Sequence, residues 1–137
     1  MYLVPLGDWT RGPLKQKNVM PALNFKKQFA PKVESGEKRQ TIRAIRNTPF
    51  KEGDILYLYT GMRTRSCRKL GEAKALEVQS IVIIQSIENV LIDEIALEKE
   101  EITELAQSDG FDSSYDFFGF FAETYKEEVF EGQLIKW

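Results

Sequence analysis

Residues 36–43, GEKRQTIR, follow a segment at 27–34 whose composition suits a short helix. The glycine that begins the stretch is typical of a residue that ends a helix, because glycine readily adopts the left-handed backbone conformation found there. Polar and apolar residues then alternate over 40–45, which predicts a strand with Ile42 and Ile45 near one face. The stretch therefore predicts a helix, a tight turn and a strand in direct succession.

Three side chains of this stretch can carry chemistry. Thr41 and Arg43 share one face of the predicted strand, because successive side chains of a strand point to opposite faces. Lys38 lies in the turn just before the strand and can fold over the same face. A threonine hydroxyl is a poor nucleophile unless a base takes its proton. Burial and neighbouring cations such as Arg39 lower the pKa of a lysine, which would make Lys38 such a base.

The segments on either side of this unit alternate between strand and helix patterns. Strands are predicted at 22–25, 55–59, 73–84, 87–92 and 133–137, and helices at 98–107 and 114–125. EGD at 52–54, DG at 109–110 and EG at 131–132 read as turns or helix stops. The order strand, helix, several strands, two helices, strand predicts an α+β fold with a mixed β-barrel or half-barrel and short flanking helices.

The chain is of single-domain size. It has 137 residues, of which 42% are hydrophobic and 29% charged. We expect an N-terminal arm at 1–21, which is rich in glycine and proline, and one domain at 22–137. No apolar run approaches the roughly 18 residues that a membrane helix needs, and no secretory signal pattern is present. The sequence thus predicts a cytoplasmic protein without a membrane partner; it does not set the oligomeric state.

The chain contains no histidine and a single cysteine, Cys67. These counts exclude Ser–His and Cys–His nucleophile pairs, histidine-ligated zinc and a thiolate metal cage within one chain. A catalytic base must then be Lys, Asp, Glu or Tyr, or the chemistry must use a carboxylate-bound metal.

Charge is distributed very unevenly along the chain. Residues 11–74 hold 16 Lys/Arg and 5 Asp/Glu, a net charge of +11, whereas residues 75–137 hold 3 and 15, a net charge of −12. A basic half of this strength favours an anionic partner such as RNA, a nucleotide or phosphate. The alternative is that the acidic half folds over the basic half and neutralises it.

The stretch 36–43 resembles the central signature of the ASCH superfamily, which is a glycine, a lysine two residues on, and then Thr-Ile-Arg. KEGDIL at 51–56 is similar to the family's glycine-aspartate element before a strand. DGF at 109–111, ahead of a capped helix, and a final strand at 135–137 also match. The resemblance extends from about residue 22 to the C-terminus.

The resemblance implies a PUA-like β-barrel with a cleft. Members of the family are linked to RNA binding, some are described as ribonucleases, and one branch consists of bacterial N4-acetylcytidine amidohydrolases. In that branch a glutamate assists the lysine, and the matching position here is Asp109, which is one methylene shorter. Glu104 is a second choice for this acid.

The resemblance leads us to expect an amidohydrolase that acts on N4-acylcytidine or a related acylated nucleobase. Thr41 would attack the amide carbonyl, Lys38 would be the base, Asp109 would orient the lysine, and Arg43 would bind substrate or stabilise the oxyanion. No cofactor is required. The alternatives are a non-catalytic RNA-binding module that uses the same cleft and a metal-assisted ribonuclease.

A basic segment at 62–69 is a second candidate for contacts with RNA or a modified nucleoside. Its cations, Arg63 among them, suit phosphate oxygens, and Tyr57 or Tyr59 on the preceding strand could stack on a base. The alternative interpretation is an ordinary basic surface loop. Cys67 lies among these cations, which favour its thiolate, but without a partner base we expect it to have no catalytic role.

Overall fold

The computed structural model describes residues 22–137, so the predicted arm at 1–21 lies outside the described part of the chain. In chain order the elements are β2 (Ala22–Phe25), α1 (Ala30–Ser35), β3 (Gln40–Ala44), β4 (Ile55–Thr60), β5 (Arg68–Lys74), β6 (Glu77–Ile84), β7 (Asn89–Ile92), β8 (Ile95–Ala96), α2 (Lys99–Ser108), α3 (Ser114–Tyr125) and β9 (Val129–Lys136). The predicted α+β class and the predicted order of elements are confirmed.

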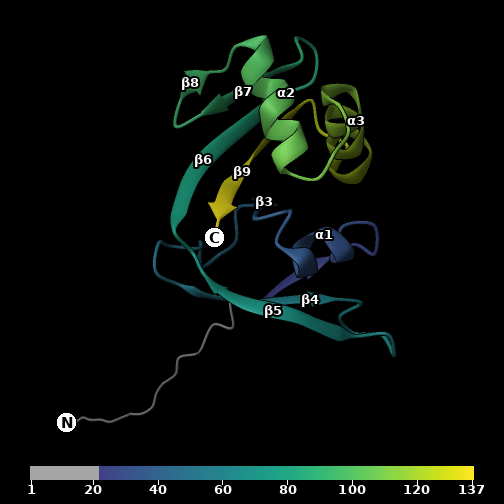
Figure 1. Cartoon of the computed structure of the whole chain (residues 1–137). Helices are drawn as coiled ribbons and strands as arrows, with labels where there is room; N and C mark the ends of the chain where they lie inside the picture. Colours follow the sequence, from purple (N-terminus) through teal and green to yellow (C-terminus); the bar gives the residue numbers. More distant parts are fainter. Residues whose placement is uncertain (1–21) are drawn as a thin grey trace, which may run out of the picture.

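The strands form two sheets, with the helices beside them (Figure 1). The smaller sheet has the order β2-β4-β5, with β2 parallel to β4 and β4 antiparallel to β5. The larger sheet has the order β3-β9-β6-β7-β8 and is antiparallel throughout. Helix α1 contacts β5 of the small sheet, while α2 and α3 pack on each other at the end of the molecule where β7 and β8 lie. Within residues 22–137 the two sheets do not close into a barrel.

Strand β9 lies between β3 and β6 and is longer than predicted. The turn expected at 131–132 is wrong, because both residues pair inside the strand. Gly132 lies opposite Ala44 of β3, and a Cβ atom there would be 2.3 Å from the carbonyl oxygen of Arg43 and 2.7 Å from the ring of Phe130. The glycine therefore serves the close approach of β3 to β9 rather than a turn.

We expect Gly132→Ala to destabilise the fold strongly. The new methyl group meets backbone and a packed ring, so β3 or β9 must shift, and overpacking of this kind costs about 1–3 kcal/mol. Chemical denaturation of the variant and the wild type measures the loss. Gly119→Ala is the matched control, since a Cβ atom there meets nothing within 4 Å and alanine is favoured over glycine inside a helix. Equal midpoints for the two variants would contradict the packing argument.

The single long strand predicted at 73–84 is two strands in different sheets. The chain changes sheets at Ala75, a buried residue whose amide and carbonyl bond to Asp54 and Gly53. Leu76 then donates to the carbonyl of Lys136 and starts the pairing with β9. No glycine, proline or other turn residue lies at 73–78, so the residue pattern does not mark the change.

Local signals around the signature stretch were mostly correct. Gly36 is the left-handed residue that ends α1, and Ile42 lies in a strand as predicted and is buried. The expectation for Ile45 is wrong: it lies past the end of β3 and is 56% exposed.

The aromatic helix α3 supplies much of the core. Ser113 caps it by accepting a hydrogen bond from the amide of Asp116. Phe117, Phe118 and Phe121 are buried, and their rings meet one another at 5.0–5.4 Å. Among residues 22–137, no helix combines the length and the apolar character needed to cross a membrane.

Candidate functional site

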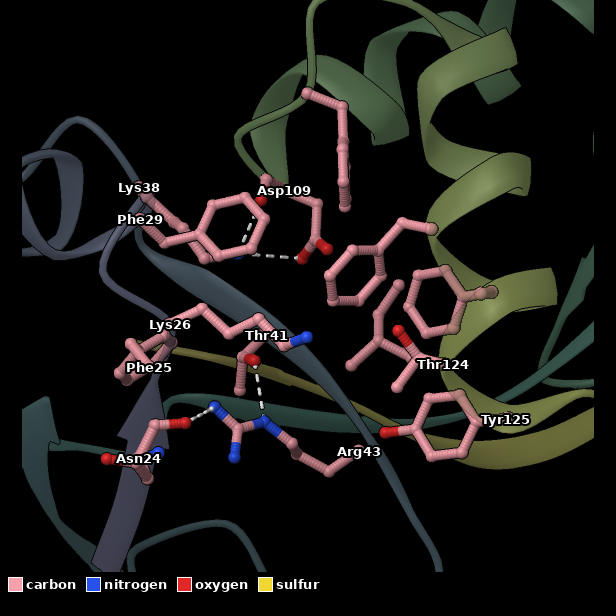
Figure 2. A pocket seen from close by; sticks show the side chains of 14 residues that line it. Asn24, Phe25, Lys26, Phe29, Lys38, Thr41, Arg43, Asp109, Thr124 and Tyr125 are labelled. Atoms are coloured by element: carbon pink, nitrogen blue, oxygen red, sulfur yellow. Dashed lines mark hydrogen bonds and ion pairs between the residues drawn. The ribbon is translucent and has the colours of Figure 1, made fainter. Parts of the chain in front are cut away.

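A cavity of about 190 Å³ lies over β3, between β2 and α1 on one side and α3 on the other (Figure 2). Four of the residues selected from the sequence, Lys38, Thr41, Arg43 and Asp109, line it together. Aromatic rings form much of the remaining wall; they belong to Phe25, Phe29, Phe111, Phe120, Phe121 and Tyr125. The cavity therefore combines a few polar groups with apolar walls, which is the usual composition of a small-molecule site.

Lys38 and Asp109 form a buried ion pair although 71 residues separate them. The Nζ atom of Lys38 lies 3.2 Å from Oδ1 of Asp109 and also donates to the Asp109 backbone carbonyl. The two residues are only 3% and 4% exposed. Lys32 of α1 donates to the carbonyl of Gly110 at 3.1 Å. These bonds hold the turn that carries Lys38 against the end of α2.

Burial shifts the pKa of both members of this pair in the direction that favours the neutral form. Loss of solvent lowers the pKa of Lys38 below its ordinary 10.5, and this exceeds the opposing effect of Asp109. Loss of solvent likewise raises the pKa of Asp109 above its ordinary 3.8, against the opposing charge of Lys38. The opposite charge of each group limits the pKa shift of the other. A lysine in this environment can lose its proton more readily than a solvated one and can act as a base.

Gln40 is part of this arrangement and was not singled out from the sequence. It is buried at the start of β3, and its Nε2 atom donates to Oδ1 of Asp109 at 3.4 Å. This bond stabilises the carboxylate and fixes its orientation toward Lys38. In the sequence, Gln40 looks like an ordinary polar residue of an alternating strand.

Thr41 is held by Arg43, its neighbour on the same face of β3, as the strand periodicity predicted. The Nε atom of Arg43 donates to Oγ1 of Thr41 at 2.9 Å, and its Nη2 atom donates to the carbonyl of Asn24 at 2.8 Å. The guanidinium group also lies over the ring of Phe25, 4.9 Å from its centre. A cation that donates to the hydroxyl oxygen stabilises negative charge on it and leaves its proton free to be donated elsewhere.

Lys38 and Thr41 face the same cavity but are not hydrogen-bonded to each other; of the described residues, only Arg43 bonds to the Thr41 side chain. Figure 2 shows the lysine directed to Asp109 and the threonine directed to Arg43. A base can reach its proton through one water molecule, and catalytic hydrogen bonds often tighten only when substrate binds. The candidate nucleophile and the candidate base therefore face one cavity, and each is held in place by a different residue.

Tyr125 packs against the core and also lines the cavity. Its ring stacks on Phe121 with centres 5.8 Å apart, and Figure 2 shows its hydroxyl on the Arg43 side of the cavity. Partial burial raises the pKa of Tyr125 above its ordinary 10.0, so the hydroxyl stays protonated at neutral pH and can donate a hydrogen bond. Helical spacing alone cannot separate a core tyrosine from one that lines a cavity.

Lys26 also lines the cavity, and its ammonium group lies 5.2 Å from the centre of the Phe120 ring. In the sequence, Lys26 is distinguished only by its position directly after a short predicted strand. The lysine follows β2 and the ring belongs to α3, and these two elements are far apart in the chain order.

Two predicted substrate-binding residues lie elsewhere. Tyr59 is on β4, in register with Asn24 and Lys69, and Arg63 is an exposed loop residue with φ of 67°. Neither lines the cavity that holds Lys38 and Thr41. Cys67 is exposed in the same loop. The structure thus brings together the predicted catalytic residues and Arg43, but not Tyr59 or Arg63.

Comparisons of the chain with protein-family models, with curated proteins and with solved structures gave no match. The functional argument therefore depends on the cavity and on its residues. In the part of the chain from 22 to 137, no three His, Cys, Asp or Glu side chains gather in a way that could hold a metal ion.

Proposed function

We propose that this protein is an ASCH-type amidohydrolase with a PUA-like arrangement of strands, which removes the acyl group from N4-acylcytidine or a related acylated nucleobase. The observation that carries the proposal is one cavity that holds a buried lysine–aspartate pair and a threonine bonded to an arginine. A nucleophile, a base and an oxyanion donor are the parts that acyl transfer requires.

The reaction would begin with attack of Thr41 Oγ1 on the amide carbonyl carbon while the hydroxyl proton passes to the neutral amine of Lys38. Arg43 and the hydroxyl of Tyr125 would stabilise the negative charge that forms on the carbonyl oxygen. Arg43 uses two of its five N–H groups on Thr41 and Asn24, which leaves others for the substrate. The lysine would then return its proton to the exocyclic amine as the C–N bond breaks.

Water would complete the cycle by attacking the carbonyl carbon of the threonine ester, with Lys38 taking the proton of the water and returning it to Thr41 Oγ1 as the ester C–O bond breaks. The products are the free nucleobase amine and a carboxylic acid. Asp109 and Gln40 would hold the lysine in place throughout, and the aromatic walls fit a flat base.

The direct test is incubation of the full chain with N4-acetylcytidine, with and without EDTA, and separation of cytidine by chromatography. We expect cytidine in both samples. We also expect the rate to rise with pH, because only neutral Lys38 is a base, and the midpoint to lie below 10.5, because burial lowers its pKa. Asp109→Asn should move the midpoint lower still, since it removes a charge that raises this pKa.

Other outcomes of this experiment would favour the alternatives. A rate that needs a divalent metal, together with cleavage of a labelled single-stranded RNA, would favour the metal-assisted ribonuclease. If no deacylation is seen at any pH, the result favours the non-catalytic RNA-binding module. A midpoint that Asp109→Asn does not change would show that Lys38 is not the titrating base.

The distribution of ion pairs favours an anionic partner, both for the amidohydrolase and for the two alternatives. Of the ion pairs among residues 22–137, only Lys38–Asp109 joins the basic half of the chain to the acidic half. The other pairs lie within one half. The acidic half therefore does not neutralise the basic half through ion pairs, which leaves its exposed cations available to a ligand.

A further inference from the structure

A second, wider hollow adjoins the catalytic cavity. It has a volume of about 580 Å³ and shares Asn24, Phe25 and Lys26 with that cavity. We define it as the basic groove; its other lining residues are Lys27, Ala30, Pro31, Thr60, Gly61, Ser66 and Arg68. Three of the lining residues are cationic and none is acidic, whereas Asp109 lines the catalytic cavity.

We propose that the basic groove binds the phosphate of a nucleotide whose base occupies the catalytic cavity. This inference rests on the proposed function and names its substrate class: a phosphorylated nucleoside, either a mononucleotide or a residue of single-stranded RNA, rather than a free nucleoside. The three residues shared by the two hollows set them side by side. In a nucleotide, likewise, the base and its own phosphate are separated by one ribose.

The wall between the two hollows is fixed by hydrogen bonds. Asn24 accepts a bond from Arg43 on its carbonyl at 2.8 Å and a bond from the amide of Met62 on its side-chain oxygen at 2.9 Å. Thr60 donates to the carbonyl of Phe25 at 2.8 Å. The arginine of the catalytic cavity and the loop of the basic groove are thus both attached to Asn24 of β2. A ligand that spans both hollows would meet a rigid wall.

The loop between β4 and β5 has a defined shape. Thr64 donates to the carbonyl of Gly61 at 2.6 Å and accepts from the amide of Ser66 at 3.1 Å. Gly61 has φ of 67°, and a Cβ atom there would lie 2.8 Å from the carbonyl oxygen of Ser66, so the turn requires glycine. Ser66 and Arg68 are therefore presented to the groove by a preorganised turn.

The cations of the groove are accessible to a phosphate. Arg68 pairs with Glu34 at 2.7 Å, but both side chains are about half exposed, at 52% and 48%. An ion pair of this kind contributes little, and a phosphate can replace the carboxylate. Lys27 is exposed and lines the same groove. Lys and Arg side chains around phosphate oxygens are the usual means by which proteins hold a nucleotide backbone.

The test compares kcat/KM for N4-acetylcytidine, its 5′-monophosphate, its 3′-monophosphate and a short single-stranded RNA with one N4-acetylcytidine. We expect at least one phosphorylated substrate to exceed the free nucleoside by about tenfold or more. In the double variant Lys27→Ala/Arg68→Ala this ratio should fall toward one. A mononucleotide that matches the RNA identifies a single phosphate as the ligand, and an advantage confined to RNA identifies the polymer backbone.

The matched control is Lys51→Ala/Lys74→Ala, which removes the same charge at exposed residues that line neither hollow. It should keep the ratio of the wild type. The proposal is overturned if no phosphorylated substrate is preferred, or if the two double variants lower the ratio equally, which would show a general effect of charge.

A binding experiment tests whether the basic groove holds a phosphate even if no substrate is deacylated. Calorimetric titration with cytidine and with cytidine 5′-monophosphate should show tighter binding of the phosphate form, and the difference should shrink with added salt and in Lys27→Ala/Arg68→Ala. Equal affinity for the two ligands would reject the groove, whereas failure of deacylation alone would reject only the proposed reaction.

Discussion

Thr41→Ala should lower kcat/KM for N4-acetylcytidine by roughly 10⁴-fold, and Lys38→Ala should lower it by nearly as much, since losses of this order follow removal of a nucleophile or its base. The first variant removes the attacking oxygen, and the second removes the group that takes its proton. Because the two act as a unit, the double variant should be scarcely worse than either single variant. Thr41→Ser retains a hydroxyl that Arg43 can still bond and should keep appreciable activity.

Steady-state kinetics of the wild type, the two single variants and the double variant check this prediction. Circular dichroism must accompany them, because Thr41 is buried in β3 and alanine is a poor strand former. A wild type that hydrolyses the substrate and a Thr41→Ala variant that does so equally well would disprove the threonine mechanism. Losses that multiply in the double variant would show that the two residues act independently.

Asp109→Ala should destabilise the fold by about 3–5 kcal/mol, the range found when one partner of a buried ion pair is removed. The change leaves the amine of Lys38 in a site where it is 3% exposed and without its carboxylate partner. Asp109→Asn should cost less, because the amide oxygen can still accept from Lys38 and the backbone carbonyl remains in place. Urea denaturation measures both losses.

The pH dependence of the loss gives a sharper test. Without Asp109, burial would lower the pKa of Lys38 further below 10.5, because the carboxylate that raises it is gone. Between that lowered pKa and 10.5 the unfolded chain binds more protons than the folded one, so the stability of the variant should rise with pH. Lys38 of the wild type has the same effect only above its own, less strongly lowered pKa. The deficit relative to the wild type should therefore narrow between the Lys38 pKa of the variant and that of the wild type, both of which lie below 10.5.

Asp112→Ala provides the control for this series. Asp112 is an exposed carboxylate three residues further along the chain, and substitutions of such surface residues usually change stability by no more than about 0.5 kcal/mol. If Asp109→Ala is as stable as Asp112→Ala, the pair is not the structural constraint we describe. A deficit that stays constant with pH would show that its origin is packing rather than the charge of Lys38.

The sequence by itself determined the local parts of the site. The strand periodicity placed Thr41 and Arg43 on one face, and the hydrogen bond between them confirms that placement. Gly36 marked the end of a helix, because glycine readily takes the left-handed conformation that satisfies a helix terminus through contacts within a few residues. Because the chain has no histidine, the candidate base near Thr41 is a lysine, Lys38, which lies three residues before it.

Only the tertiary structure decided what surrounds those residues. Asp109, which the family resemblance suggested as the partner of Lys38, reaches it from 71 residues away, and Gln40 turns its amide to that carboxylate. Tyr125 lines the cavity while it packs on Phe121 and Phe130. Gly132 lies in a strand because β3 passes close to it, not because the chain turns there. The periodicity of a sequence shows which face of an element is buried, but not which distant element packs against that face. The pKa of Lys38 depends on those distant contacts.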